Sequence, residues 1–239
     1  MFRLSRFESL RLGNFYRSIP NPRCRSASNS FKTFKNPMKK LFTLVALAGL
    51  FGTSLHAQQQ VQLKVGDVEV GKIEYDAQKT PSFQAGDVKV KDVPNPRDWL
   101  ELEVEFKVKG DPKTVVKDLL FRYYIGFKDQ SGAARILTGD VKHINIVPGE
   151  DSFSAVYVAP STLGEITGDF RRFQPNSVEA VGVEVYYNGV IVGGKSSLSG
   201  GRAKFWESTG TQPGVLGKAD TPFALLWIDR YAEVEKATR

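Results

Sequence analysis

One segment of the sequence constrains the fold more than any other, because apolar and charged residues alternate strictly from Leu100 to Lys109. A period of two places alternate side chains on opposite faces of an extended strand. We therefore predict a strand over 99–109 with one face in a core and the other in water. The charged face carries a row of three acids, Glu101, Glu103 and Glu105. Cation sites gather oxygens by looping around the ion, so this row is interpreted as a solvated face rather than a metal site.

Similar segments recur along the chain and are separated by turns rich in Gly, Pro and Asp. Asn188-Gly189 is typical of a two-residue hairpin turn. Short strands at this spacing predict a mainly β fold of the sandwich type. The other predicted strands cover residues 61–65, 68–75, 119–127, 134–137, 141–147, 152–158, 178–187 and 190–192. Residues 193–201, mostly Gly and Ser, are predicted to form a loop or a bulged edge.

Two segments depart from the strand pattern. Residues 161–166 offer an N-cap with Glu165 as its reciprocal partner, which predicts one or two helical turns. Thr221-Pro222 is typical of an N-cap followed by the first helical position. The apolar residues of 223–234 fit a helical stripe, but they also fit a period of two. The sequence therefore leaves helix and strand open for 221–235, with helix favoured.

Residues 38–57 have the three parts of a secretory signal: a basic start at Lys39-Lys40, an apolar run and a small-residue exit at Ala57. A membrane helix needs about 20 apolar residues, so the run is interpreted as a cleaved signal and not as a retained transmembrane segment. Residues 1–37 show no apolar period that packs a core, and we interpret them as a non-native extension upstream of Met38. A transit peptide is the weaker alternative. Residues 58–239 are then a single domain with an N-terminal arm.

The positive charge of the chain lies almost entirely in the removed part. Residues 1–57 hold ten of the 33 Lys and Arg and one of the 26 acids, so 58–239 carry 23 basic and 25 acidic residues. A net charge of −2 argues against a nucleic-acid partner. The only cysteine, Cys24, also precedes the exported part, so the mature chain has no thiol for disulfides, catalysis or metal binding.

Two patterns resemble functional motifs but lack their context. Residues 189–196 match the phosphate-binding G-x-x-x-x-G-K-[ST] pattern, which needs a strand before the loop and a helix beginning at Lys195. A hairpin is predicted there instead, so we expect no nucleotide or other cofactor. His143 is the only histidine after residue 57. One imidazole cannot form a His-based zinc site, and no G-x-S-x-G elbow presents a serine. We therefore predict no catalytic and no metal-binding residues.

Aromatic residues on the strands leave a carbohydrate-binding surface open as an alternative. Tyr124 and Tyr186 are the candidates for a contact surface, because each lies opposite the main apolar row of its strand and is expected to reach solvent. A hydrolase with paired carboxylates is a weaker alternative, since spacing in the sequence cannot locate such a pair.

The chain after the signal resembles a known family over roughly 79–231. The resemblance rests on Arg97 to Val104, Tyr123-Tyr124-Ile125, Val192 to Ser197, Thr221-Pro222-Phe223 and Asp229-Arg230-Tyr231. In these segments the chain is similar to the secreted immunoglobulin-like protein of the type IV pilus gene cluster of Akkermansia-type Verrucomicrobia. It implies an immunoglobulin-like β-sandwich with short helices and a periplasmic, outer-membrane-associated or extracellular location. The implied role is a non-enzymatic accessory part in pilus or cell-envelope assembly or adhesion, with protein partners there.

The export hypothesis predicts the first residue of the mature protein. N-terminal sequencing of protein purified from the organism that makes it is expected to begin at Gln58, because the signal ends in the small residue Ala57. Material that still begins at Met1 would contradict both the signal and the interpretation of 1–37.

Overall fold

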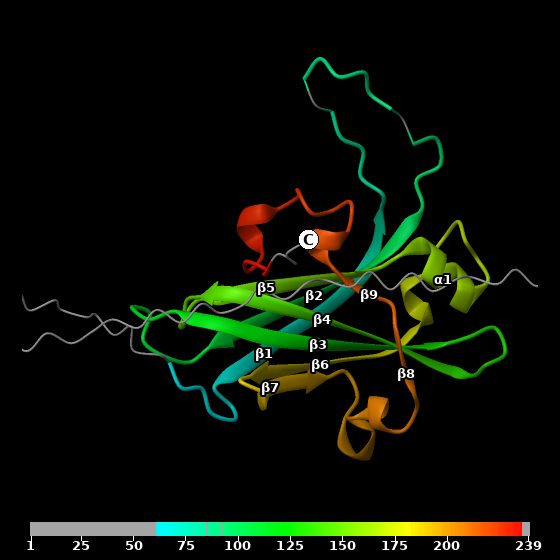
Figure 1. Cartoon of the computed structure of the whole chain (residues 1–239). Coiled ribbons are helices and arrows are strands. Elements are labelled where there is room, and N and C mark those ends of the chain that lie inside the picture. The colour runs from blue at the N-terminus through cyan, green and yellow to red at the C-terminus, as the bar shows by residue number, and fades with distance from the viewer. Residues whose placement is uncertain (1–60, 85, 92, 236–239) are drawn as a thin grey trace, which may run out of the picture. The chain divides into compact units, whose positions relative to one another are not determined.

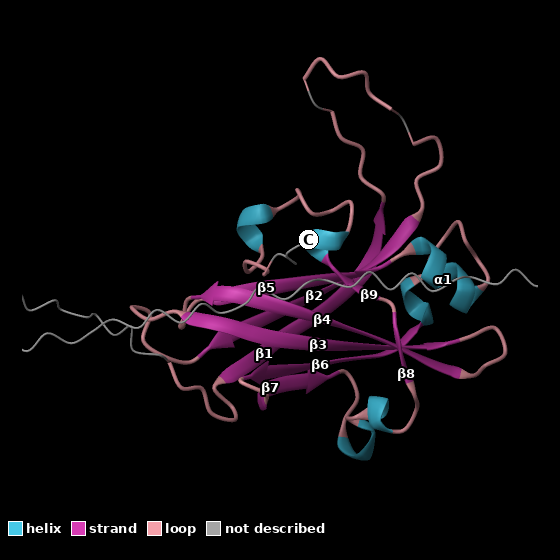
Figure 2. Cartoon of the chain, in the orientation of Figure 1, coloured by secondary structure: helices cyan, strands magenta, loops and turns pink. Residues whose placement is uncertain are grey.

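Strands dominate the part of the chain that the computed structural model describes, which is residues 61–84, 86–91 and 93–235 (Figures 1 and 2). The predictions for 1–37, for the signal at 38–57 and for Cys24 lie outside the described residues. The strands are β1 (Val68–Lys79), β2 (Asp98–Val108), β3 (Val116–Lys128), β4 (Ala134–Ile146), β5 (Asp151–Val158), β6 (Val178–Tyr187), β7 (Val190–Ser196), β8 (Thr211–Pro213) and β9 (Val215–Gly217).

The strands form two sheets. The first has the order β1-β2-β5-β9 and the second has the order β7-β6-β3-β4-β8. Every paired strand is antiparallel to its neighbour except β8, which runs parallel to β4. The chain crosses between the sheets after β2, after β4, after β5 and after β8. This alternation between two antiparallel sheets is the immunoglobulin-like form of the β-sandwich, and it confirms the predicted fold class.

The core lies between the inner faces of the two sheets. All five apolar residues of the 100–108 pattern are buried in it, as the alternation predicts. They pack with the apolar row of β3, which includes Phe121 and Ile125, and Phe106 contacts Phe121 with ring centroids 4.7 Å apart. The clearest periodic segment of the sequence is therefore a central strand of the first sheet.

Three strand predictions need correction. Residues 61–65 form no strand: the chain turns at 64–67, where the Asp67 N–H donates to the Lys64 carbonyl, and the Gly66 N–H donates to Val192 of β7. Segments 134–137 and 141–147 form one strand, β4, which continues through Gly139. A Cβ atom at Gly139 would collide with the Val215 carbonyl, so the glycine marks a close approach of backbone and not a break. Strand β7 also extends through Ser196 as an edge strand with a bulge, so the bulged edge, and not the loop, describes the first residues of 193–201.

The short helix after β5 is confirmed, but its predicted cap is wrong. Helix α1 (Pro160–Thr167) has Ala159 as its N-cap and makes no side-chain capping bond there. Pro160 occupies the first helical position, where its missing N–H has no intrahelical partner to lose. Gly168 ends the helix in the left-handed conformation and donates its N–H to Gly164. Short 3-10 helices are η1 (Pro175–Ser177), η2 (Gly200–Arg202), η3 (Phe205–Glu207), η4 (Lys218–Asp220) and η5 (Ile228–Arg230).

The C-terminal segment 221–235 is neither of the two alternatives that its sequence left open. It begins with two turns, closed by hydrogen bonds from the Ala224 N–H to the Thr221 carbonyl and from the Leu226 N–H to the Phe223 carbonyl, and continues into the 3-10 helix η5. Isolated bridges then join Tyr231 to Phe153 of β5 and Val234 to His143 of β4. The segment therefore pairs with strands of both sheets, which a continuous helix would prevent.

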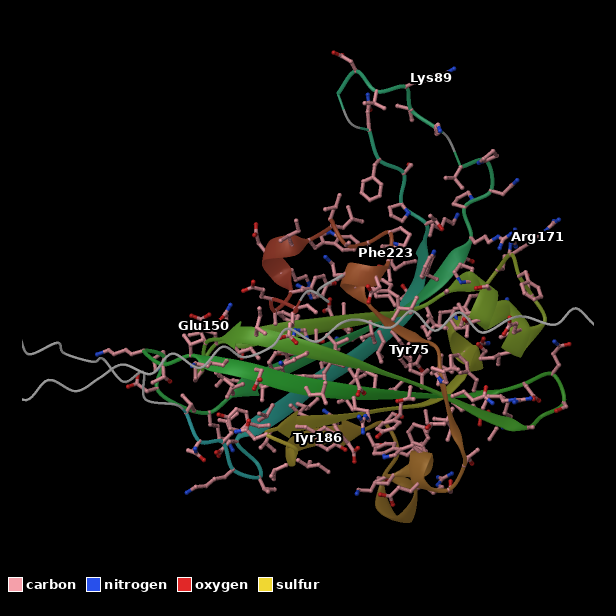
Figure 3. All side chains as sticks on the ribbon, in the orientation of Figure 1. Tyr75, Lys89, Glu150, Arg171, Tyr186 and Phe223 are labelled. Atoms are coloured by element: carbon pink, nitrogen blue, oxygen red, sulfur yellow. The ribbon has the colours of Figure 1, made fainter. Side chains whose placement is uncertain are left out.

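Phe223 holds the beginning of this segment against the outer face of the first sheet (Figure 3). Its ring stacks on Tyr157 with centroids 4.4 Å apart and meets the edge of Trp99 at 5.8 Å. Phe223 is 1% exposed, whereas Leu225, two residues later, is 71% exposed. The segment therefore depends on one aromatic anchor near its start.

Replacing Phe223 by Ala is expected to lower the free energy of unfolding by about 3 kcal/mol, because it leaves a cavity beside Tyr157. Chemical denaturation followed by tryptophan fluorescence measures the change. Leu225→Ala is the matched control and is expected to change stability by less than about 0.5 kcal/mol. Equal effects of the two substitutions would contradict the anchoring role.

Candidate functional site

The two tyrosines predicted to form a contact surface lie on the outer face of the second sheet, on either side of the paired residues Arg122 and Glu184. Tyr124 comes from β3 and Tyr186 from β6. Both hydroxyls donate to the same carboxylate oxygen of Glu184, at 2.9 Å from Tyr124 and 2.8 Å from Tyr186. Glu184 therefore links the two predicted residues, and the sequence analysis did not identify this glutamate.

Tyr124 does not reach solvent, contrary to the prediction. The indole of Trp206 stacks on its ring with centroids 4.3 Å apart and planes 1° from parallel, and Tyr124 is only 7% exposed. Gly182 lies opposite Tyr124 in the strand pairing, and a Cβ atom there would collide with Trp206. A glycine in the sheet thus provides the space for the indole that covers Tyr124.

Tyr186 remains half-buried at the edge of a shallow hollow of about 450 Å³ (Figure 3). The guanidinium of Arg122 lies over its ring, 5.5 Å from the centroid. Arg122 also makes two hydrogen bonds to Asp140 on the neighbouring strand, at 2.8 and 2.7 Å. The hollow therefore presents one aromatic ring beside a rigid Arg–Asp pair.

The charges of this surface shift the acidity of the tyrosines. Burial, followed by the hydrogen bond to Glu184, raises the pKa of both hydroxyls above the usual value. The hydrogen bonds to Asp140 raise the pKa of Arg122. Both phenols therefore stay protonated at neutral pH and act as hydrogen-bond donors, while Arg122 keeps its charge.

Three polar side chains form a second cluster inside the core, between the two sheets. The Tyr123 hydroxyl donates to Ser154 Oγ at 2.5 Å, and Ser154 Oγ lies 2.5 Å from His143 Nε2. His143 Nδ1 lies 3.3 Å from the carbonyl oxygens of both Ala232 and Glu233. Carbonyl oxygens only accept, so Nδ1 carries the proton and Nε2 accepts the proton of the Ser154 hydroxyl. The result is one directed chain of hydrogen bonds from β3 to the C-terminal segment.

This chain has the distances of a serine nucleophile and its base, but it lacks their access to solvent. Tyr123 and Ser154 are fully buried and His143 is 1% exposed. Backbone carbonyls orient the imidazole where hydrolases use a carboxylate. Burial also lowers the pKa of His143 to about 4, so the ring is neutral at physiological pH. The predicted ordinary strand histidine is thus a buried hydrogen-bond junction.

The row of glutamates on β2 is not the open solvated face that the alternation predicts. Arg230 makes two hydrogen bonds to Glu103, and the Tyr231 hydroxyl donates to the same carboxylate at 2.8 Å. The Tyr157 hydroxyl donates to Glu101 at 2.5 Å. The hydrogen bond from Arg230 lowers the pKa of Glu103. Glu103 therefore anchors the C-terminal segment to the first sheet, and Glu101 binds Tyr157 of β5 within that sheet.

The residues that match a phosphate-binding loop adopt the predicted hairpin. Asn188 and Gly189 both have positive φ, as the hairpin turn requires, and strand β7 follows at once. Lys195 lies within this strand and donates to the Gly71 carbonyl at 2.5 Å. The helix N-terminus that would hold a phosphate is not formed by these residues.

Among the described residues, no group of three or more His, Cys, Asp or Glu is arranged to hold a metal ion. In the same part of the chain, no helix is long and apolar enough to cross a membrane.

The fold and surface together define an immunoglobulin-like β-sandwich protein with a sealed polar core. A protein-family model matches residues 58–238. A crystal structure of a protein from Akkermansia muciniphila is similar over 72% of this chain and 94% of its own, at 30% identity and a TM-score of 0.63. The chain belongs to the family that this model describes, and the Akkermansia muciniphila protein is similar to it in sequence and fold. No curated protein matched the chain.

The buried His143 predicts how stability depends on pH. Its pKa is about 4 in the folded protein and about 6.5 in the unfolded chain, so the unfolded state binds more protons between these values. Stability is therefore complete above about pH 6.5 and falls as the pH is lowered towards 4, by on the order of 3 kcal/mol.

Urea denaturation at several pH values between 5 and 7 measures this dependence, and His143→Gln is expected to flatten it. The window lies above the titration of the carboxylates, so the comparison isolates the histidine. An unchanged slope in the variant would contradict the assignment.

Proposed function

We propose that the protein is a non-catalytic, exported immunoglobulin-like module that acts by contact with protein partners of the cell envelope. The observation that carries this proposal is the connection between β1 and β2, which projects away from the two sheets (Figure 1). Its described residues include four large apolar side chains that are 43 to 70% exposed: Phe83, Val88, Val90 and Val93. Exposed apolar side chains that gather in one place are typical of a surface that binds another protein.

The polar core supports a role without catalysis. The Ser154 hydroxyl and the His143 imidazole are the pair best placed for nucleophilic chemistry, and both are sealed between the sheets. The C-terminal segment covers His143 through the carbonyls of Ala232 and Glu233, so a substrate would have to displace this segment to reach the imidazole. Ser154 and His143 instead connect β5 and β4 to the C-terminal segment, so their hydrogen bonds stabilise the fold.

The place of this module in the cell is proposed as an accessory component of a type IV pilus or of another envelope assembly or adhesion system. The support for this placement is the resemblance to the secreted protein of the Akkermansia-type pilus cluster, together with the signal-like segment at 38–57. Export to the periplasm, the outer membrane or the cell surface follows from the same segment.

A carbohydrate-binding role is the second candidate, and the hollow beside Tyr186 favours it. The half-buried ring of Tyr186 beside the hydrogen-bonded pair of Arg122 and Asp140 offers a stacking surface and polar contacts of the kind that a sugar requires. Tyr124 does not contribute to such a platform, since Trp206 covers it.

Crosslinking in living cells, followed by mass spectrometry, tests the contact function. We expect recovery of pilus, secretin or other envelope components, because an exported module without catalysis acts through bound partners. A glycan array with a hydrolysis readout serves as the rival test. Sugar cleavage that one Asp or Glu substitution abolishes would refute the non-catalytic role.

Binding without cleavage on the array would favour the second candidate. In that case, Tyr186→Ala is expected to abolish binding, and Tyr75→Ala, which changes an exposed tyrosine on β1, is the matched control. Loss of binding in both variants would argue against the hollow as the sugar site.

A further inference from the structure

A polar cleft of about 820 Å³ lies where the β1–β2 connection leaves the sandwich, beside the loop that follows α1. Four cationic side chains line it: Lys79 and Arg97 from the two ends of the connection, and Arg171 and Arg172 from the loop. All four are exposed. Residues 58–239 as a whole carry a net charge of −2. The cleft is therefore a positively charged site on a slightly negative domain.

The four cations of the cleft outnumber the two carboxylates that line it, and the described residues form no ion pair with them. Among these residues, no carboxylate oxygen lies within the 4.0 Å of an ion pair from the charged nitrogens of the four. Asp98 and Asp169 also line the cleft, but backbone N–H groups occupy them. Asp169 accepts from the N–H groups of Arg171 and Arg172 at 2.8 and 3.0 Å, and Asp98 accepts from Phe173 at 3.2 Å.

These two carboxylates fix the positions of the cations. Asp169 folds the loop tightly around itself, and its pKa is lowered by the two backbone hydrogen bonds. Asp98 ties the same loop to the start of β2, and Phe173 anchors it in the core against Phe127. The loop that carries Arg171 and Arg172 is therefore held in place before any ligand arrives.

The other side of the cleft is equally well held. Thr80 N–H donates to the Arg97 carbonyl at 3.1 Å, which closes the base of the β1–β2 connection. The Trp99 indole N–H donates to the Thr80 hydroxyl at 3.0 Å and fixes this closure to β2. A preorganised pair of walls loses little entropy when a ligand binds.

A second hollow of about 390 Å³ lies on the other side of the same base. It shares Asn95 and Arg97 with the basic cleft, and its remaining walls include Val93, Trp99 and Pro160. A ligand that spans both hollows would place an anionic group among the arginines and an apolar group beside Val93 and Trp99. Adjacent acidic and apolar side chains on an extended peptide meet this requirement.

We propose that the basic cleft and the neighbouring apolar hollow together form a docking site for an acidic, apolar-bearing peptide segment of a protein partner. This inference rests on the proposed contact function and specifies where on the module the contact is made and with what chemistry. Guanidinium groups recognise carboxylates through two parallel hydrogen bonds, so three arginines favour a partner rich in Asp or Glu. A purely anionic polymer would leave the apolar hollow unused, and a flat membrane would not enter the cleft.

Fluorescence anisotropy tests the site with a labelled peptide in which Glu alternates with Leu, and with the same peptide carrying Gln in place of Glu. The wild-type protein is expected to prefer the Glu peptide and to lose affinity as salt is raised. Arg97→Glu combined with Arg171→Glu is expected to weaken binding at least about tenfold.

The matched control is Lys113→Glu combined with Lys117→Glu, which reverses two exposed charges elsewhere and is expected to leave binding unchanged. Thermal unfolding verifies that each variant is folded, and Val93→Asp provides an independent test of the apolar hollow. Equal losses in the two double variants, or equal binding of the Gln peptide, would overturn the proposal. Stronger binding to dextran sulfate or to phosphatidylglycerol vesicles would also overturn it.

A photo-crosslinking residue placed at Asn95 or at Lys113 in living cells separates this inference from the proposed function. Envelope proteins captured from position 95 and not from position 113 support both. Capture from position 113 alone contradicts the docking site and leaves the contact function standing. No capture of envelope proteins from any position contradicts the proposed function, while the peptide assay still reports on the cleft.

Discussion

The backbone edges of β4 and β5 impose the main constraint on this sandwich. These strands belong to different sheets and lie next to each other where the chain crosses between them, so their outer N–H and C=O groups need partners. Two stretches in the last part of the chain form hydrogen bonds with these groups. Strands β8 and β9, joined at Gly214, pair with β4 and β5 at one end. Nearer the C-terminus, the Ala232 N–H donates to Phe153 and the Ile144 N–H to Glu233. One continuous segment therefore closes this side of both sheets.

The buried hydrogen bonds of Tyr123, Ser154 and His143 connect the C-terminal segment to the core. Ala232 and Glu233 accept the proton of His143, whose other nitrogen accepts from Ser154. An unmade hydrogen bond at a buried polar group costs about 1 to 3 kcal/mol, so these contacts disfavour any arrangement in which the C-terminal segment leaves. Groups that serve catalysis in other proteins stabilise the edge of the sandwich here. The surface proposed for function lies beside this closure, at the base of the β1–β2 connection, where Trp99 contacts Phe223 of the C-terminal segment.

The sequence predicted the sheet architecture well and the candidate surfaces poorly. Period-two patterns located β2, β3, β5 and β6, because each has one face in a common core. Tyr124 fits the same pattern, yet it is buried, because its cover comes from Trp206, which is distant in sequence. The cleft of Arg97 and Arg171 was equally invisible, since its residues lie on two loops that meet only in the folded chain. Within one stretch of sequence, the adjacent residues Arg171 and Arg172 were the only sign of a positively charged site.

What the sequence by itself determined is what depends on neighbouring residues: strand periodicity, the Asn188-Gly189 turn and the helix after β5. Local sterics and the alternation of side chains set these features wherever the chain lies. Tertiary structure alone decided the form of 221–235, where helix and strand patterns were nearly balanced. Phe223 stacking on Tyr157 and Arg230 pairing with Glu103 favour an irregular path across the first sheet. When local preferences are nearly equal, contacts between distant residues choose the conformation.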